Sequence, residues 1–232
     1  LHGDLGVSIT SLEPVSRIIG QRLPNSLSLA LPAFAIIMVI SVVLGTTVAI
    51  RTWRRPARVI DSAFTGVTSV LNSIPDFALA TGLVALFSVS LGMLPVAGRS
   101  GPLSYVLPIA SLAIGSVATL ARITRVETDR ILRSDYIRAA VGRRVRPWSL
   151  YCRHVLPNML TATLTYGGLL LSSMVAGTVI VENVFAWPGI GTKITEAVIG
   201  KDYALVQGIV LLIGTLVLLI NFAVDLLLLF ID

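Results

Sequence analysis

The chain has 232 residues, of which 55% are hydrophobic and only 13% are charged, and its mean hydropathy is +0.88. Since a soluble domain carries about 25% charged residues, this composition excludes a soluble globular enzyme, a disordered segment and a nucleic-acid-binding domain, and it predicts an all-α, polytopic membrane protein. The net charge is +6, and the single cysteine, Cys152, permits neither an internal disulfide nor a two-cysteine metal or redox site.

Uncharged runs of roughly 20 residues predict the membrane helices, because that length crosses the apolar core of a bilayer. Residues 1–22 are expected outside the membrane, and the first helix is expected over 23–50. The next span, over 59–98, begins with a short stretch rich in Ser, Thr and Asn, and Pro75 is expected to break it. The remaining three of the five spans are expected over 100–125, 155–181 and 203–231, with a loop over 126–154.

The basic residues predict how these spans are oriented. Four arginines lie in 51–58 and nine in 122–153, together 13 of the 18 Lys and Arg residues. Cytoplasmic loops collect basic residues, so both segments are expected inside the cell, with the residue-1 end outside and the C-terminus cytoplasmic. An alternative with six spans in this chain would separate the two clusters and is rejected. Because the chain starts with Leu1 and shows no signal peptide, we expect a longer protein with six spans.

The arginine-rich segment that follows the third span is the most informative part of the chain. On composition alone it predicts a solvated loop that only sets the topology. Its residue order is more specific: Asp-Tyr-Ile-Arg-Ala-Ala-Val-Gly-Arg-Arg begins at Asp135, Pro147-Trp148 follows, and His-Val-Leu-Pro-Asn begins at His154. This order resembles the EAA loop of permease subunits of binding-protein-dependent ABC importers, and most closely the dipeptide and oligopeptide branch.

In that family the loop forms a short coupling helix that sits in a groove of a cytosolic ATPase. By position, Arg138, Ala139 and Ala140 take the three EAA places. The family's glycine falls on Arg144, and the nearest glycine is Gly142, which departs from the pattern. The resemblance implies that the following residues couple to the ATPase: Asp135, Tyr136, Arg138, Ala139, Ala140, Gly142, Arg143, Arg144, Arg146, His154, Leu156 and Pro157.

Other segments agree with the same family. Ser-Ile-Pro-Asp-Phe from Ser73 is similar to its Ser-x-Pro-x-Phe element, and the stretch from Glu182 to Gly191 is similar to its Glu-x-x-Phe-x-x-Pro-Gly-x-Gly signature. Together the matching elements cover essentially all 232 residues. The resemblance implies a single transmembrane domain over 1–232 with the type I ABC importer permease fold, as in a B-type subunit of the peptide and nickel permeases.

The candidates for the translocation pathway and its outer gate are Asn72, Ser73, Asp76, Phe77, Glu182, Phe185, Trp187, Pro188 and Gly189. Two interpretations of 182–191 stay open: a re-entrant turn that closes the outer mouth, or an interfacial turn with Trp187 as an aromatic anchor. If Glu182 lies deep in the membrane, Lys193 is its candidate partner. Asn72 and Ser73 have the alternative of bonding to neighbouring helices.

The chain contains no phosphate loop, no HExxH and no GxSxG motif, so no cofactor, metal site or catalytic centre is expected in it. The resemblance implies a non-catalytic pathway subunit of an ATP-driven importer of peptides in the bacterial plasma membrane. It implies as partners a second permease subunit, in a heterodimer, two ABC ATPase subunits that bind ATP and Mg, and an external substrate-binding protein. Nickel, glutathione or haem are alternative substrates, and a secondary transporter, a channel or a membrane scaffold are alternative functions.

Overall fold

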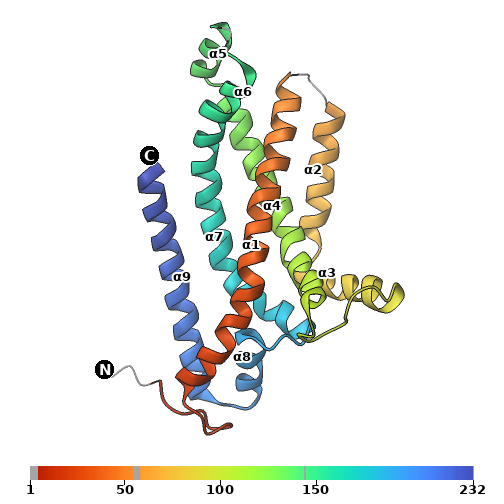
Figure 1. The fold of residues 1–232 in the computed structure, drawn as a ribbon, viewed down its shortest axis with the longest axis vertical. Coiled ribbons are helices and arrows are strands. Elements are labelled where there is room, and N and C mark those ends of the chain that lie inside the picture. Colours follow the sequence, from red (N-terminus) through yellow and green to blue (C-terminus); the bar gives the residue numbers. More distant parts are fainter. Residues whose placement is uncertain (1–4, 55–57, 144, 232) are drawn as a thin grey trace. The chain divides into compact units, whose positions relative to one another are not determined.

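The computed structural model describes residues 5–54, 58–143 and 145–231, and these ranges are almost entirely helical (Figure 1). Within them no strand is present, and one antiparallel bridge joins Val7 to Pro14. The all-α class expected from the hydropathy is therefore confirmed.

Nine α-helices and three tighter or wider helical turns follow one another in these ranges. The α-helices are α1 (Val15–Arg54), α2 (Arg58–Ser73), α3 (Asp76–Leu83), α4 (Val106–Leu132), α5 (Asp135–Gly142), α6 (Pro147–Leu150), α7 (Leu156–Val184), α8 (Ile190–Ile199) and α9 (Tyr203–Ile231). π-helical turns lie at Val84–Ser90 and Tyr151–Val155, and a 3-10 turn lies at Pro102–Tyr105.

Three stretches are long and apolar enough to cross a membrane unbroken: Val15–Trp53, Pro102–Leu132 and Tyr203–Leu229. Two bent pairs also qualify, Arg58–Ser73 with Asp76–Ser90, and Trp148–Val175 with Gly177–Val184, which bends by 48°. Counting each bent pair as one span gives up to five, the number expected from the sequence.

The bend between α2 and α3 is 93°, and Pro75 lies in it, as the sequence predicts. Proline has no N–H to donate, and it disfavours the helical conformation of the residue before it. The same span was expected to reach residue 98, but its helix ends at Ser90. Gly92 and Gly98 have φ values of 62° and 81°, a left-handed conformation that glycine adopts without strain and that no helix continues through.

Other expected boundaries also differ from the observed ones. Helix α1 begins at Val15, inside the segment expected to precede the first helix. Helix α4 runs to Leu132, so the expected loop 126–154 contains the end of α4 together with α5 and α6. Helix α8 was not expected at all, because its ten residues are too few to give a membrane-span pattern.

The structure forms two compact units. Unit one comprises 1–34, 75–113 and 171–221, and unit two comprises 35–74, 114–170 and 222–232. In unit one, the ends of α1, α8 and α9 share an apolar core formed by Val15, Ile18, Ile19, Ile190, Ala197, Leu205 and Ile209. The boundary between the units falls inside four of the helices, so each unit is described below by itself.

In unit two, α1 and α4 approach so closely that only glycine fits at position 45. A Cβ added to Gly45 would lie 2.6 Å from the carbonyl oxygen of Ala121 and 2.7 Å from the Cβ of Thr124. Such close contact is how helices associate in membranes, where apolar burial supplies no driving force. The Oγ1 atoms of Thr124 on α4 and Thr163 on α7 lie 3.4 Å apart, so a polar contact joins these two helices as well.

Candidate functional site

The turn that joins α7 to α8 is built around one buried carboxylate. Glu182, in the last turn of α7, is 0% exposed. Its Oε2 accepts hydrogen bonds from the backbone N–H groups of Gly191 at 2.7 Å and Thr192 at 3.3 Å. These N–H groups belong to the first turn of α8, where helical amides have no partner within the helix. Glu182 therefore caps α8, and we call residues 182–192 the Glu182 turn.

Close contacts within this turn explain why glycine stands at two of its positions. A Cβ added to Gly189 would collide with the carboxylate of Glu182, and one added to Gly191 would collide with the backbone of Val179. The chain must also reverse tightly here, and Ala186 takes a φ of 45°. Glu182, Gly189 and Gly191 stand at the spacing that resembles the family signature. This spacing lets the start of α8 pack against the carboxylate that caps it.

The aromatic residues of the Glu182 turn are buried within unit one. Phe185 is 2% exposed and Trp187 is 0% exposed. Trp187 Nε1 donates to the backbone oxygen of Asn25 at 3.0 Å, and its ring packs edge-on against Tyr105 with centroids 4.7 Å apart. The alternative in which Trp187 is a lipid-facing aromatic anchor is therefore wrong. Phe185 and Trp187 form the body of the turn, and Pro188 joins it through its backbone oxygen, which accepts from Asn25 Nδ2 at 2.8 Å.

Lys193, expected as the partner of Glu182, pairs with Glu196 instead, at 3.0 Å. This expectation was wrong because two backbone N–H groups in the first turn of α8 already donate hydrogen bonds to the Glu182 carboxylate. Sequence reasoning weighed only side-chain charges, while a helix N-terminus also carries a partial positive charge.

A second buried carboxylate, Asp202, holds the N-terminal segment in unit one. It is 0% exposed and accepts hydrogen bonds from the hydroxyls of Ser8 and Thr10. Its Oδ1 accepts from the backbone N–H of Leu205 at 3.2 Å, which caps α9. Burial alone raises the pKa of Asp202, but the hydrogen bonds from Ser8, Leu205 and Thr10 outweigh it and hold the pKa well below its usual range. An aspartate directly before an apolar helix was the available sequence signal.

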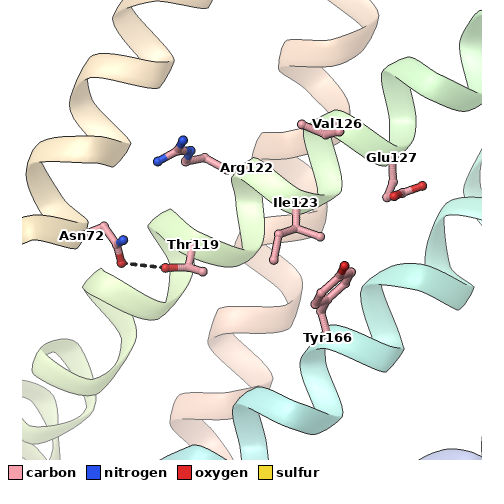
Figure 2. A pocket seen from close by; sticks show the side chains of 7 residues that line it. All are labelled: Asn72, Thr119, Arg122, Ile123, Val126, Glu127 and Tyr166. Atoms are coloured by element: carbon pink, nitrogen blue, oxygen red, sulfur yellow. Dashed lines mark hydrogen bonds between the residues drawn. The ribbon is translucent and has the colours of Figure 1, made fainter.

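Unit two contains a polar groove of about 350 Å³ between α2, α4 and α7 (Figure 2). It is lined by Asn72, Thr119, Arg122, Ile123, Val126, Glu127 and Tyr166. Figure 2 shows Asn72 of α2 meeting Thr119 of α4, whose hydroxyl donates to Asn72 Oδ1 at 2.7 Å. The side chain of Tyr166 points from α7 toward α4. We call this the α2–α4–α7 groove.

The two charged residues of this groove point to opposite sides. In Figure 2, Arg122 extends toward α2 while Glu127 extends away from it. Arg122 Nη1 donates to Ser69 Oγ at 3.4 Å, and Glu127 lies 3.8 Å from Arg130. Next to the groove, Arg125 pairs with Asp61 and ties α4 to α2.

Of the pathway candidates, only Asn72 lines this groove. Its partners come from three helices far apart in the sequence, so spacing along the chain held no signal for Thr119, Arg122, Glu127 or Tyr166. Ser73 lies in unit two and donates its hydroxyl to the backbone oxygen of Ser69. The remaining candidates lie in unit one: Asp76 and Phe77 are exposed at the start of α3, and Glu182, Phe185, Trp187, Pro188 and Gly189 form the Glu182 turn.

The segment expected to couple to an ATPase packs one face on unit two and exposes the other. Ile137 of α5 is 0% exposed and lies in an apolar cluster with Ala49, Leu132, Leu150 and Val155. Ala140, the third of the EAA places, is half-buried against this cluster, so it faces the chain's own core. Trp148 at the start of α6 is 80% exposed. The exposed coupling candidates are Asp135, Tyr136, Arg138, Ala139, Gly142, Arg143, Arg146 and Pro157, while Arg144 lies outside the described residues.

The base of this coupling segment, residues 135–157, is tied to the start of α7 by a residue that sequence reasoning left out of the site. Asn158 Nδ2 donates to the backbone oxygen of His154 at 2.6 Å and to the hydroxyl of Tyr136 at 3.4 Å. His154 and Leu156 are both half-buried beside it. Asn158 stands in the His-Val-Leu-Pro-Asn motif, so the motif held the signal, but the bridge to Tyr136 needs α5 folded back onto α7.

Comparison with known proteins gives concordant findings. Residues 41–232 match the family described as "Binding-protein-dependent transport system inner membrane component". A putative peptide transport system permease protein of Brucella abortus is 38% identical over 97% of this chain and 73% of its own length. A dipeptide transport system permease protein of Bacillus subtilis is 33% identical over 96% and 71%, and a glutathione transport system permease protein of Pectobacterium atrosepticum is 35% identical over 98% and 73%.

Two solved structures share the fold. The MetNI methionine ABC transporter in an inward-facing conformation superposes with a TM-score of 0.76 at 18% identity, over 95% of this chain and 99% of that one. An amino acid ABC transporter with bound histidines superposes with a TM-score of 0.61 at 17% identity, over 92% of each chain. At these identities the likeness concerns the fold, which is that of the type I ABC importer permeases.

Proposed function

This chain belongs to the family of inner membrane components of binding-protein-dependent transport systems, and from that premise we propose that its cargo is short peptides and that cytosolic ATPases drive its transport. Two of the similar proteins named above carry peptide or dipeptide in their names, and a third carries glutathione, itself a tripeptide. Peptides are the chemistry that these names share, which favours them over nickel or haem.

The observation that carries the ATPase proposal is the outward face of the coupling segment. Trp148 is 80% exposed, and Arg138, Arg143 and Arg146 of the same segment are exposed as well. Tryptophan and arginine are the residues that protein interfaces concentrate at their energetic centres. The chain has no phosphate loop of its own, so the energy for transport must come from a partner. We place an ATPase on this face, and the segment in the cytoplasm.

The α2–α4–α7 groove is proposed as part of the translocation pathway. Asn72, Thr119, Arg122 and Tyr166 are exposed, and the groove that they line also contains the apolar Ile123 and Val126. Polar and charged groups facing lipid are expensive, so such groups are expected to face a water-filled path or a partner subunit. In the same orientation, the Glu182 turn and the residue-1 end face outside the cell.

The proposed assembly has four kinds of component. This chain pairs with a second, related permease subunit, two ATPase subunits bind ATP and Mg on the cytosolic side, and an external protein delivers the peptide. ATP-driven closure of the ATPases then moves the coupling segments of the two permeases together and opens the pathway to the outside. This chain contributes binding surfaces and movement, and the hydrolysis takes place in the partners.

The test combines purification with charge reversal. We expect the full-length protein, isolated from its native membrane in mild detergent, to bring phosphate-loop ATPases and a second permease with it. Arg138→Glu, Arg143→Glu and Arg146→Glu together should release the ATPases and abolish ATP-driven peptide uptake, with the permease pair intact. Arg17→Glu, an exposed arginine of unit one, is the control and should change neither.

Two results would contradict this function. If the triple variant keeps both ATPase association and uptake, the coupling segment is not the docking surface. If the chain is recovered alone from a preparation in which other membrane complexes survive, a channel or secondary transporter becomes the better hypothesis. Uptake of nickel or haem, but of no peptide, into proteoliposomes would replace the proposed cargo.

A further inference from the structure

Arg99, in the loop before α4, is a cation that neutral groups hold in place. Its Nε donates to the hydroxyl of Tyr105 at 2.9 Å, and its Nη1 donates to Asn25 Oδ1 at 2.6 Å. The guanidinium carbon lies 5.9 Å from the centroid of the Tyr105 ring. Over residues 5–54, 58–143 and 145–231, no carboxylate pairs with it. A guanidinium has five N–H donors, so these contacts orient the group while leaving its charge and several donors to a ligand.

This guanidinium lines an open groove of about 630 Å³ within unit one. The other lining residues are Ser28 and Pro32 of α1, Gly101, Pro102, Tyr105 and Ile109, so Arg99 is the only charge that the described lining presents. The volume lies within the range of about 300–1,000 Å³ that small-molecule sites occupy. An apolar wall with one oriented cation is complementary to a ligand with an apolar body and one anionic end.

We propose that Arg99 binds the C-terminal carboxylate of the peptide cargo. The inference rests on the proposed function, because it takes the cargo to be a peptide. A guanidinium matches a carboxylate in geometry and can bind it through two parallel N–H···O bonds. The positive charge favours this end of the peptide over its ammonium end, and since no carboxylate pairs with Arg99 in the part of the chain that the structure describes, no such ion pair has to be broken first.

The site is also rigid, which reduces the entropy that binding would otherwise cost. Asn25, which accepts from Arg99, donates its Nδ2 to the backbone oxygen of Pro188, and its own backbone oxygen accepts from Trp187 Nε1. Tyr105, the other acceptor, packs against the ring of Trp187. Arg99 is therefore positioned by the Glu182 turn, and a carboxylate at Arg99 contacts a preformed group.

The experiment measures binding to the assembled transporter, without the external binding protein, in nanodiscs of phosphatidylcholine. The probes are trialanine and trialanine C-terminal amide, which differ only in the carboxylate, and the readout is equilibrium dialysis. We expect wild type to bind the acid about tenfold more tightly than the amide. The amide lacks the negative charge and so loses at least one charge-assisted hydrogen bond to Arg99. Arg99→Gln should bind both probes equally, at the wild-type affinity for the amide. Arg17→Gln should behave as wild type.

A second variant and a wild-type measurement cover the case in which Arg99→Gln fails to assemble. Arg99→Lys keeps the charge without the planar fork and should retain part of the preference for the acid. In wild type alone, the preference should shrink as salt is raised, because screening weakens an exposed ion pair.

Several outcomes would overturn the proposal. An undiminished preference for the acid in Arg99→Gln, or a salt-independent one in wild type, would show that Arg99 does not bind the carboxylate. If Arg99→Gln instead loses bound phosphatidylglycerol in native mass spectrometry while peptide binding stays unchanged, the oxyanion at this site is a lipid phosphate. Failure of the proposed function gives a different pattern: wild type then imports neither trialanine nor any other short peptide in the complete ATP-driven system.

Discussion

In the Glu182 turn, one fully buried carboxylate accepts hydrogen bonds from two backbone amides of the same chain. In the coupling segment, three arginines are exposed, and the tryptophan of the same segment is 80% exposed. A buried charge is stable only when nearby groups satisfy it, and in the first arrangement the start of α8 satisfies one of the two carboxylate oxygens. In the second, Arg138 lies 3.6 Å from the carboxylate of Asp135, and the groups that bind proteins best remain exposed. The chain's own folding therefore accounts for the first region, while the second is exposed, and we propose that an ATPase covers it.

The glycines of the two regions show the same difference. At Gly191 an added Cβ would collide with the backbone of Val179, so the chain itself requires the small residue. At Gly142 an added Cβ meets nothing within 4 Å. Gly142 has open space around it and lies near the exposed Ala139, so no steric contact within this chain requires a glycine at this position. It fits a surface that another protein approaches closely.

The largest expected effect follows from removing the buried cap. Glu182→Ala leaves two amides of α8 without an acceptor, and it should lower the stability of the folded protein by about 3 kcal/mol. Glu182→Gln keeps an acceptor oxygen and should cost about 1 kcal/mol. Thermal unfolding of the transporter in nanodiscs measures both. If Glu182→Ala unfolds at the wild-type temperature, the turn is not held by its carboxylate and the comparison fails.

A matched pair of glycine substitutions sharpens the contrast. Gly191→Ala overfills a closed contact and should destabilise the protein by about 2 kcal/mol. Gly142→Ala should leave stability unchanged or raise it by less than about 1 kcal/mol, since alanine favours a helix. Its effect should appear instead as weaker ATPase retention on an affinity column. Equal unfolding temperatures for the two variants would remove the distinction between the regions.

The second buried carboxylate predicts a dependence on pH. Because the hydrogen bonds from Ser8, Leu205 and Thr10 lower the pKa of Asp202, its contribution to stability is complete above the unfolded-state pKa of about 3.9. That contribution is lost as the pH falls below this value toward the lower folded-state pKa. Asp202→Asn should cost about 1–2 kcal/mol at pH 7, and its unfolding temperature should converge with wild type below about pH 4. A gap that stays constant down to pH 3 would contradict the ionised cap.

The smallest effect on stability is expected at the most exposed aromatic residue. Trp148→Ala removes few contacts within the chain and should change stability by less than about 0.5 kcal/mol. As an interface anchor, however, its loss should weaken ATPase binding about tenfold or more. Co-purification against ATPase concentration measures the binding. If Trp148→Ala lowers the unfolding temperature strongly while the protein that remains folded binds ATPase as wild type does, Trp148 belongs to the chain's own structure, against the comparison.

Membrane spans were predictable because their signal is local. The last span was expected over 203–231 and α9 covers Tyr203–Ile231, since hydropathy along the chain suffices to mark an unbroken apolar helix. The break at Pro75 was predictable for the same reason, as proline acts within one turn. The end of the following helix was not, because Ser90 is followed by turn geometry at Gly92 that hydropathy does not register.

The site residues show the same difference between features with a local sequence signal and features that depend on distant residues. Residue order alone marks the segment that we propose for ATPase coupling, and the structure places its exposed Arg138 on α5 and its exposed Trp148 on α6. The partner of Glu182 was missed because it is a backbone N–H of α8, which carries no residue letter. Thr119, Arg122 and Tyr166 were missed because α2, α4 and α7 meet only in three dimensions.

Composition and residue order were thus sufficient for the class of protein and for the approximate positions of its apolar spans, and they mark the segment that we propose contacts a partner. These properties depend on the solvent of each segment and on neighbours along the chain, both of which are written in the sequence. The closure of α8 onto Glu182, the cap that Asp202 gives α9, and the oriented cation at Arg99 were decided by tertiary structure. Each requires atoms far apart in the chain to lie within hydrogen-bonding distance, and only packing of the helices determines which distant residues meet.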